Sequence, residues 1–241
     1  MARSSPLLRL RELAQDQWGL VTRRQIDAAG IGPTTVDRLT QPGAELERVA
    51  HGVYKLGGTP IPDHRDLRAA WLQLAPEVPA WKRAADQGVV SHRSAAALYG
   101  VGKLPADRHE FTMPTRRQTR RPDVRIHVRS LSDGEWLHLG GLPVTRPSRI
   151  ASDLLWDHED PEAVAHIVAE SIRRILDYPG TFADSLAPHA GRFGLRKGDG
   201  IGLLRWLIGL VGEPDGERWM EEAWAHVDRV APRHEMAGEA R

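Results

Sequence analysis

The first 57 residues carry helix start and stop signals so closely spaced that only short helices fit between them, and this spacing constrains the fold most. The apolar residues of "PLLRLRELAQDQ" recur at helical spacing and predict a first helix that ends at Trp18 and Gly19. A capping box, with Thr22 as N-cap and Gln25 three residues later, predicts a second helix. Gly30 is the expected stop of that helix, because glycine adopts the left-handed conformation that ends many helices.

A third helix and a β-hairpin complete this segment. Pro33 suits the first turn of a helix, so "GPTTVDRLT" is predicted to be helical, with Val36 and Leu39 facing inward. "LERVAHGVYKL" then contains two β-rich runs around His51 and Gly52, a pattern typical of a hairpin. Three helices followed by a hairpin, with a short glycine-containing connection between the second and third helices, is the order of a winged helix-turn-helix.

Polar and basic side chains occupy the predicted outer faces of this segment. Thr34, Thr35 and Arg38 lie on the exposed face of the third helix and are types that hydrogen-bond phosphates or base edges. The second helix and the hairpin add further polar or basic residues: Arg23, Arg24, Arg48, His51 and Lys55. Each residue alone is typical of a solvated surface, whereas their grouping on one face predicts contact with double-stranded DNA.

Charge is distributed unevenly along a chain whose formal net charge is only +1. Residues 80–130 hold 11 basic and 4 acidic residues, whereas residues 151–241 hold 10 basic and 17 acidic ones. The middle of the chain therefore favours a polyanionic partner, and the acidic C-terminal part is interpreted as a solvated surface.

The absence of cysteine excludes disulfides, cysteine-ligated metal sites and thiolate catalysis, and it favours a cytoplasmic location. No apolar run approaches the ~18 residues that a transmembrane helix needs. Charges also interrupt the N-terminus where a signal peptide would be apolar. We therefore expect a protein that is neither secreted nor membrane-spanning.

The most basic stretch, "PTRRQTRRPDVR", lies between two predicted strands, "HEFTMP" and "VRIHVRSL". We expect these strands to pair as an antiparallel hairpin with the basic stretch as its loop. Apolar and basic residues alternate along the second strand, so the charge is expected to continue down one face through Arg125, His127 and Arg129. An auxiliary polyanion-binding surface is predicted from six arginines of this region: Arg116, Arg117, Arg120, Arg121, Arg125 and Arg129.

The expected fold class is α+β. A winged helix-turn-helix at 1–57 is followed by a short linker at 58–62 and by a mixed middle domain at 63–150, which has antiparallel strands and a further hairpin at Gly140 and Gly141. Residues 151–230 are predicted to be helical, and residues 231–241 to form a mobile tail.

The sequence shows no assembled active site. A restriction-type nuclease needs an acidic residue and a following Glu-x-Lys or similar pair to hold Mg²⁺, but no lysine follows Glu135 at the offset that would complement Asp123. The histidines lack metal-ligand spacing, and Ser91 beside His92 is interpreted as a helix cap. We expect no catalytic residues, no metal and no cofactor.

Four segments in order resemble the AbiEi-type antitoxins of type IV toxin–antitoxin systems. They are "GLVTRRQIDAAGI", "ERVAHGVYKL", "VVSHRSAAALYGV" and "GLPVTRPSRIASDLL", and the resemblance covers residues 7 to about 155. It implies a bacterial autorepressor that binds inverted repeats in its own promoter, with Thr34, Thr35 and Arg38 on the DNA-facing helix. It also implies a phage-defence antitoxin that counters a nucleotidyltransferase-like toxin, without implying that the two proteins bind directly.

Two alternatives remain open at this point. The protein could be an interaction module that neutralises a partner toxin through its basic middle domain. The same N-terminal segment also occurs fused to nuclease-like domains, so a degenerate form of such a fusion is the other alternative.

Overall fold

The structure, a computed structural model, describes residues 5–230 and divides into two compact units. The first unit contains the described residues up to Leu98 together with Ala106–Thr145. The second contains Tyr99–Pro105 and the described residues from Arg146 onward. The expected tail at 231–241 lies outside the described residues.

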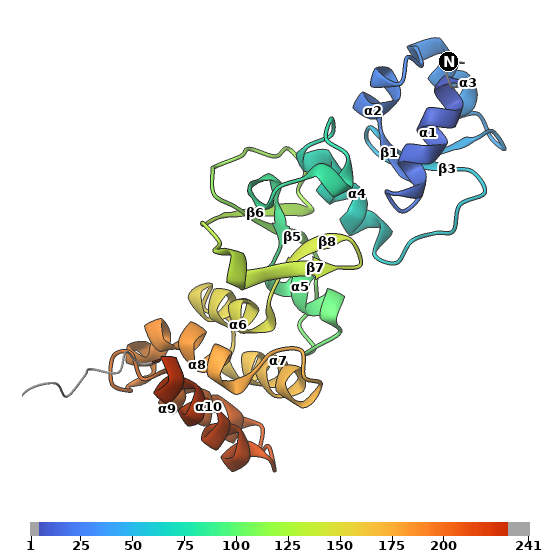
Figure 1. Ribbon diagram of the computed structural model, residues 1–241. Helices are drawn as coiled ribbons and strands as arrows, with labels where there is room; N and C mark the ends of the chain where they lie inside the picture. The colour runs from blue at the N-terminus through green and yellow to red at the C-terminus, as the bar shows by residue number, and fades with distance from the viewer. Residues whose placement is uncertain (1–4, 231–241) are drawn as a thin grey trace, which may run out of the picture. The chain divides into compact units, whose positions relative to one another are not determined.

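The first unit begins with a winged helix-turn-helix (Figure 1). Its elements in chain order are α1 (Pro6–Gln15), β1 (Leu20–Thr22), α2 (Arg23–Ala28), α3 (Pro33–Leu39), β2 (Leu46–Ala50) and β3 (Val53–Leu56). Strand β3 is central in a three-stranded sheet and pairs antiparallel with both β1 and β2. The predicted order of helices and hairpin is confirmed, whereas strand β1 was not expected.

The helix start and stop signals predicted for this segment are present in the structure. The backbone N–H of Gln25 donates to Thr22 Oγ1 at 3.2 Å, and the N–H of Thr22 donates to Gln25 Oε1 at 2.9 Å, so the capping box is confirmed. Pro33 begins α3, and Gly30 has the positive φ of 86° that suits glycine. Apolar residues of all three helices and of the sheet share one core: Leu10, Ala14, Val21, Ile26, Ile31, Val36, Leu39, Leu46, Tyr54 and Leu56.

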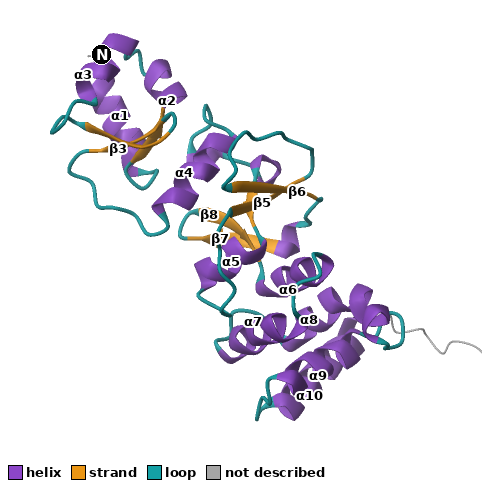
Figure 2. Ribbon diagram, turned by 180° about the vertical axis from the view of Figure 1, so that it is seen from behind, coloured by secondary structure: helices purple, strands orange, loops and turns teal. Residues whose placement is uncertain are grey.

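A second, five-stranded sheet follows in the same unit (Figure 2). Its strands are β4 (Val89–Val90), β5 (His109–Met113), β6 (Val124–Val128), β7 (Trp136–Leu139) and β8 (Leu142–Thr145). Two helices belong to the same part of the chain: α4 (Arg65–Leu74) and α5 (His92–Tyr99). The strand order is β6-β5-β4-β8-β7. Strands β7 and β8 pair antiparallel, which confirms the hairpin predicted at Gly140 and Gly141.

The pairing of β5 with β6 differs from the expectation. The two strands are parallel, in a register that places His109 opposite Val124 and Met113 opposite Val128. Residues 114–123 are therefore a crossover connection between parallel strands and not the loop of a hairpin. Ten residues can span roughly 33 Å, about twice the length of a five-residue strand. The connection is therefore long enough to run back from the end of β5 to the start of β6. We call residues 114–123 the arginine connection.

Helix α4 joins the two sheets of the first unit, since it contacts β1, β2 and β3 as well as β5. Trp18 adds a second link: its Nε1 donates to the carbonyl of Gly140 at 3.0 Å. The Trp18 ring also lies edge-on to Trp71 and under the guanidinium of Arg68, with 4.4 Å between Arg68 Cζ and the ring centroid. The winged helix and the second sheet thus form one unit, although we expected a linker to separate them.

The second unit is helical, as predicted for this part of the chain. Its helices are α6 (Pro147–Trp156), α7 (Pro161–Arg173), α8 (Pro179–Leu186), α9 (Gly200–Leu210) and α10 (Gly216–Val230). Trp219 and Met220 of α10 are buried, and so are Leu203, Leu204 and Leu207 of α9. Across residues 5–230, no helix combines the length and the apolarity needed to cross a bilayer.

Candidate nucleic-acid interface

Helix α3 presents the three polar residues that the sequence assigned to DNA. Val36 and Leu39 are buried, which turns the opposite face of the helix outward, where Thr34 and Arg38 are exposed and Thr35 is half-buried. The Arg38 side chain has no hydrogen-bond or ion-pair partner within residues 5–230. The helix therefore offers a cation and two hydroxyls to a ligand.

Helix α2 and the wing, which is the β2–β3 hairpin at residues 46–56, carry further cations. Arg23 Nε lies 2.9 Å from Asp27 Oδ1, one turn along the same helix. Arg24 lies 3.9 Å from the carboxylate of Glu77 and is mostly exposed. On the wing, Arg48 contacts the ring Nδ1 of His51 at 3.3 Å.

Lys55 does not belong to this set, which corrects its assignment as a wing residue that contacts DNA. It lies on the central strand β3, between Leu20 of β1 and Glu47 of β2, and its side chain is only 8% exposed. The ammonium donates to the carbonyl of Thr59 at 3.3 Å and lies 3.4 Å from the Glu47 carboxylate. The Lys55 charge is thus used inside the protein.

The arginine connection approaches α2 and the wing, so two basic regions that are about 70 residues apart in sequence line a single cavity. The cavity has a volume of about 690 Å³. We call it the basic cavity. Its cationic or titratable basic side chains come from α2, the wing and the arginine connection: Arg23, Arg24, Arg48, His51, Arg120 and Arg121. Asp27 is the one carboxylate in its wall.

The end of α4 holds the arginine connection against the wing. Arg117 donates to the backbone carbonyl of Leu74, and Arg121 donates to the side-chain oxygen of Gln73. The amide nitrogen of Gln73 donates in turn to the carbonyl of His51 in the wing turn. Gln73 thus bridges the wing and the arginine connection. We expected Arg117 and Arg121 to face a ligand, but Arg117 acts in the structure as an anchor.

Arg121 also pairs with Asp123, and the hydrogen bond from Arg121 holds the pKa of the Asp123 carboxyl below its usual value. Burial lowers the pKa of nearby His109, and the charge of Asp123 offsets part of that effect. Glu135, the other acidic residue weighed for a nuclease, caps a 3₁₀ turn through Ser132. Asp123 and Glu135 therefore each have a structural partner.

Arg83, which the sequence did not single out, is the second anchor at the end of α4. Its guanidinium donates to the carbonyls of Trp71 and Ala75 and lies over the Trp71 ring at 4.1 Å from the centroid. Burial, and then the charge of Arg117, lowers the pKa of Arg83 to about 9, which leaves it charged at neutral pH. The last carbonyls of a helix lack partners within the helix and attract cations, so two arginines gather there.

The other arginines predicted to bind DNA lie in different environments. Neither Arg116 nor Arg120 has a side-chain partner within the described part of the chain, and of these two only Arg120 lines the basic cavity. Arg125 Nη1 lies 3.8 Å from Glu110 Oε1. Arg129 lines a different cavity of about 260 Å³. The six arginines therefore do not form one continuous surface.

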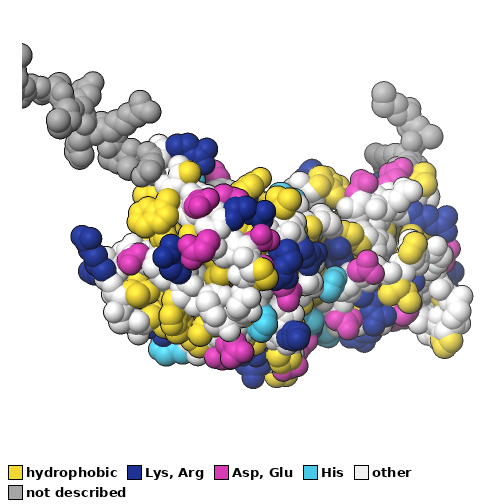
Figure 3. Space-filling model, turned by 90° about the horizontal axis from the view of Figure 1, so that it is seen from below, with side chains coloured by type: hydrophobic (Ala, Val, Ile, Leu, Met, Phe, Trp, Pro, Cys, Tyr) yellow, Lys and Arg dark blue, Asp and Glu magenta, His cyan; other side chains and the backbone are white. Residues whose placement is uncertain are grey.

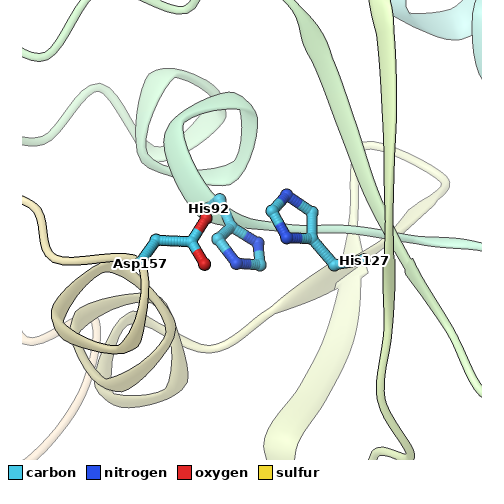
Figure 4. Close-up of side chains that lie close together, drawn as sticks. All are labelled: His92, His127 and Asp157. Atoms are coloured by element: carbon cyan, nitrogen blue, oxygen red, sulfur yellow. The ribbon is translucent and has the colours of Figure 1, made fainter.

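His127 lies inside the unit and not on the basic face of β6 where we expected it. Its ring stacks on His92, with 3.4 Å between the ring centroids, and its Nε2 lies 3.2 Å from Glu110 Oε1 (Figure 4). Ser91 Oγ lies 2.9 Å from His92 Nδ1 and accepts a hydrogen bond from Thr112 at 2.9 Å. Sequence spacing could not reveal this buried polar cluster, because its histidines are 35 positions apart.

One face of the molecular surface mixes charges of both signs. Figure 3 shows Lys and Arg side chains interspersed with Asp and Glu on that face. A strong field of one sign over that face is therefore not the feature that favours an anionic partner. The local concentration of cations at α3, α2, the wing and the basic cavity is that feature.

Comparison with known proteins finds a match for the winged helix. Residues 8–56 match the family model of AbiEi antitoxin transcriptional regulators. The match runs from α1 to the end of β3, about one fifth of the chain, and confirms the family resemblance for the winged helix. No curated protein matches the chain.

Proposed function

We propose that this protein is a cytoplasmic DNA-binding regulator that represses its own promoter. We further propose that it is the antitoxin of a type IV toxin–antitoxin system directed at a nucleotidyltransferase-like toxin. The supporting observation is that residues matching the AbiEi regulator family fold into a winged helix whose α3 presents Thr34, Thr35 and Arg38 outward. In this proposal the protein acts by binding, with no catalytic step and no cofactor.

The DNA contacts divide into two kinds. Helix α3 enters the major groove, where Arg38 can donate two hydrogen bonds to a guanine and the threonines can contact neighbouring base edges or phosphates. Arg23, Arg24 and Arg48 bind phosphates, which fixes the position of the winged helix without reading sequence. Phosphate contacts release counterions, so the affinity falls steeply as the salt concentration rises.

A single winged helix covers a short stretch of DNA. Inverted repeats would recruit two copies of the chain, one to each half-site, with the spacing of the half-sites set by the protein pair. Arg116 and Arg120 of the arginine connection would add phosphate contacts beside the wing. This arrangement would enlarge the footprint of each copy without adding sequence specificity.

A gel-shift titration of the DNA upstream of the gene tests the regulatory half of this proposal. We expect saturable binding to that DNA, weaker binding to unrelated DNA of equal length, and loss of the preference in Arg38→Ala. Equal affinity of the unmodified protein for both DNAs would overturn sequence-specific regulation.

Co-expression tests the antitoxin half. A neighbouring gene for a nucleotidyltransferase-like protein should arrest growth when induced alone, and co-expression of this protein should restore growth. Arg38→Ala should restore growth as well, if neutralisation does not depend on operator binding. Growth arrest that persists in the presence of the unmodified protein would contradict the antitoxin assignment while leaving DNA binding intact.

A further inference from the structure

We propose that the basic cavity binds a small phosphate-bearing ligand of the nucleoside phosphate class, and that this ligand competes with DNA for the arginines of α2 and the wing. The binding site stands on the geometry of the cavity alone. The competition rests on the proposed function, because it requires that α2 and the wing contact DNA.

The charge of the cavity wall favours a phosphate group. Five arginines line it, against a single carboxylate, Asp27, which already pairs with Arg23 at 2.9 Å. The arginines come from three separate segments of the chain, which the fold brings together at one cavity. Planar guanidinium groups bind phosphate oxygens through paired, charge-assisted hydrogen bonds, which makes arginine a preferred residue for this recognition.

The size and the other walls favour a nucleotide over a bare anion. A volume of about 690 Å³ lies within the range of sites that hold small organic ligands. Tyr54 and Pro76 also line the cavity and add apolar surface, which suits a planar base or sugar. A DNA duplex can offer only backbone phosphates to the mouth of such a space, whereas a mononucleotide can enter it.

Arg120 is the side chain that is best placed to bind the ligand. It lines the cavity and has no partner within residues 5–230, whereas Arg121 is held by Gln73 and Asp123. Arg116 lies four residues earlier in the same connection, also without a partner in the described chain, but does not line the cavity. Substituting each of these two arginines in turn therefore distinguishes binding at a specific site from general electrostatic attraction.

The cavity and the proposed DNA surface share side chains. Arg23, Arg24 and Arg48 belong to both, so a phosphate held in the cavity would engage cations that DNA phosphates require. Such coupling is reciprocal at equilibrium: a ligand that weakens DNA binding must itself bind more weakly to the DNA complex. The expected consequence is a repressor that releases its operator when a phosphorylated metabolite accumulates.

Fluorescence anisotropy with a labelled adenosine triphosphate tests the site in the full-length protein. We expect saturable binding that adenosine triphosphate displaces, that inorganic triphosphate displaces less well, and that adenosine does not displace. Arg120→Ala should weaken binding by about tenfold, because a charge-assisted contact is lost, while Arg116→Ala should stay within about twofold. Absence of saturable binding, or equal weakening by both substitutions, would overturn the proposal.

A second titration separates the cavity from the proposed function. Unlabelled adenosine triphosphate should release promoter DNA from the unmodified protein, whereas sodium sulfate at matched ionic strength should release less. Arg38→Ala should lose operator preference yet bind labelled adenosine triphosphate normally, which shows that the two sites fail independently. Tight nucleotide binding with no effect on promoter affinity would refute the competition and retain the site.

Discussion

Arg117 donates a hydrogen bond to the backbone carbonyl of Leu74, the last residue of α4. This contact joins the arginine connection to a helix end that also receives the guanidinium of Arg83. The basic stretch therefore has two kinds of arginine, some that hold the protein together and some that face outward. The predictions below depend on that division.

Arg117→Ala should destabilise the fold, whereas Arg116→Ala should not. The first substitution removes a hydrogen bond from a charged donor and leaves the carbonyl of Leu74 without it, which costs about 1–2 kcal/mol in the free energy of unfolding. Urea denaturation followed by tryptophan fluorescence measures both variants. Equal stabilities of the two variants would show that the anchor contributes nothing.

Arg38→Ala should reduce discrimination between the operator and unrelated DNA by ~1–3 kcal/mol, the usual contribution of a side chain that reads a base edge. Its affinity for unrelated DNA should change little. Arg196→Ala, at an exposed arginine of the second unit, serves as the control for a general loss of charge. A uniform loss across all DNA sequences would make Arg38 a phosphate contact.

Arg116→Ala combined with Arg120→Ala should weaken DNA binding at every sequence and flatten its salt dependence. If each arginine contacts one phosphate, the slope of log affinity against log salt should fall by about 2, because each contact contributes roughly 0.9. This pair leaves in place Arg117 and Arg121, which bond to Leu74 and Gln73 at the end of α4, so the fold should be retained. An unchanged slope would show that the arginine connection does not touch DNA.

Lys55→Met should leave DNA affinity within about twofold, because the ammonium is directed at Glu47 and at the carbonyl of Thr59. The loss should appear instead as a lower free energy of unfolding, by about 1 kcal/mol. Arg48→Ala, on the neighbouring strand, should show the opposite pattern: it should weaken DNA binding and leave the free energy of unfolding nearly unchanged. Gel-shift and urea titrations of both variants measure this contrast.

Stability should fall as the pH is lowered below 6.5, in part because of His109. Burial lowers the pKa of His109 in the folded state below the ordinary value of 6.5, so the unfolded chain binds a proton at a higher pH than the folded one. Protonation below that value therefore favours unfolding. The urea midpoints of His109→Gln should depend less on pH than those of the unmodified protein.

His138→Gln, at an exposed histidine of β7, is the matched control for the pH measurement. Its midpoints should follow those of the unmodified protein. Identical pH profiles for His109→Gln and the unmodified protein would remove His109 from this account.

The winged helix could be predicted from the sequence because its signals are local. The capping box of Thr22 and Gln25 and the proline at the start of α3 act within a few residues, so chain order alone reveals them. Periodicity likewise located β6. It could not give the direction of β6 relative to β5, because alternation of side chains is the same in parallel and antiparallel strands.

The candidate site was predictable only in part, since its cations meet through tertiary structure. No pattern in the sequence relates Arg120 to Arg23, and the link between their segments depends on α4 and Gln73. Lys55 was assigned to the surface because a two-stranded wing would expose it. A third strand, β1, pairs beside that position, which makes β3 a central strand, and Lys55 is buried there.

The contact of Trp18 with Gly140 limits how the winged helix of this protein can be recombined with other domains. Helix-turn-helix segments are often exchanged as separate modules. In this protein the segment is hydrogen-bonded to residues far downstream, in addition to the bond from Trp18 to Gly140. The Thr22 hydroxyl donates to the carbonyl of Pro76, and the Gln17 side-chain oxygen accepts from the backbone N–H of Ala80. A chimaera cut at residue 57 would expose these polar groups and the Trp18 ring together. New DNA specificity should therefore be introduced by changing the outward residues of α3, with the hairpin at Gly140 kept in place.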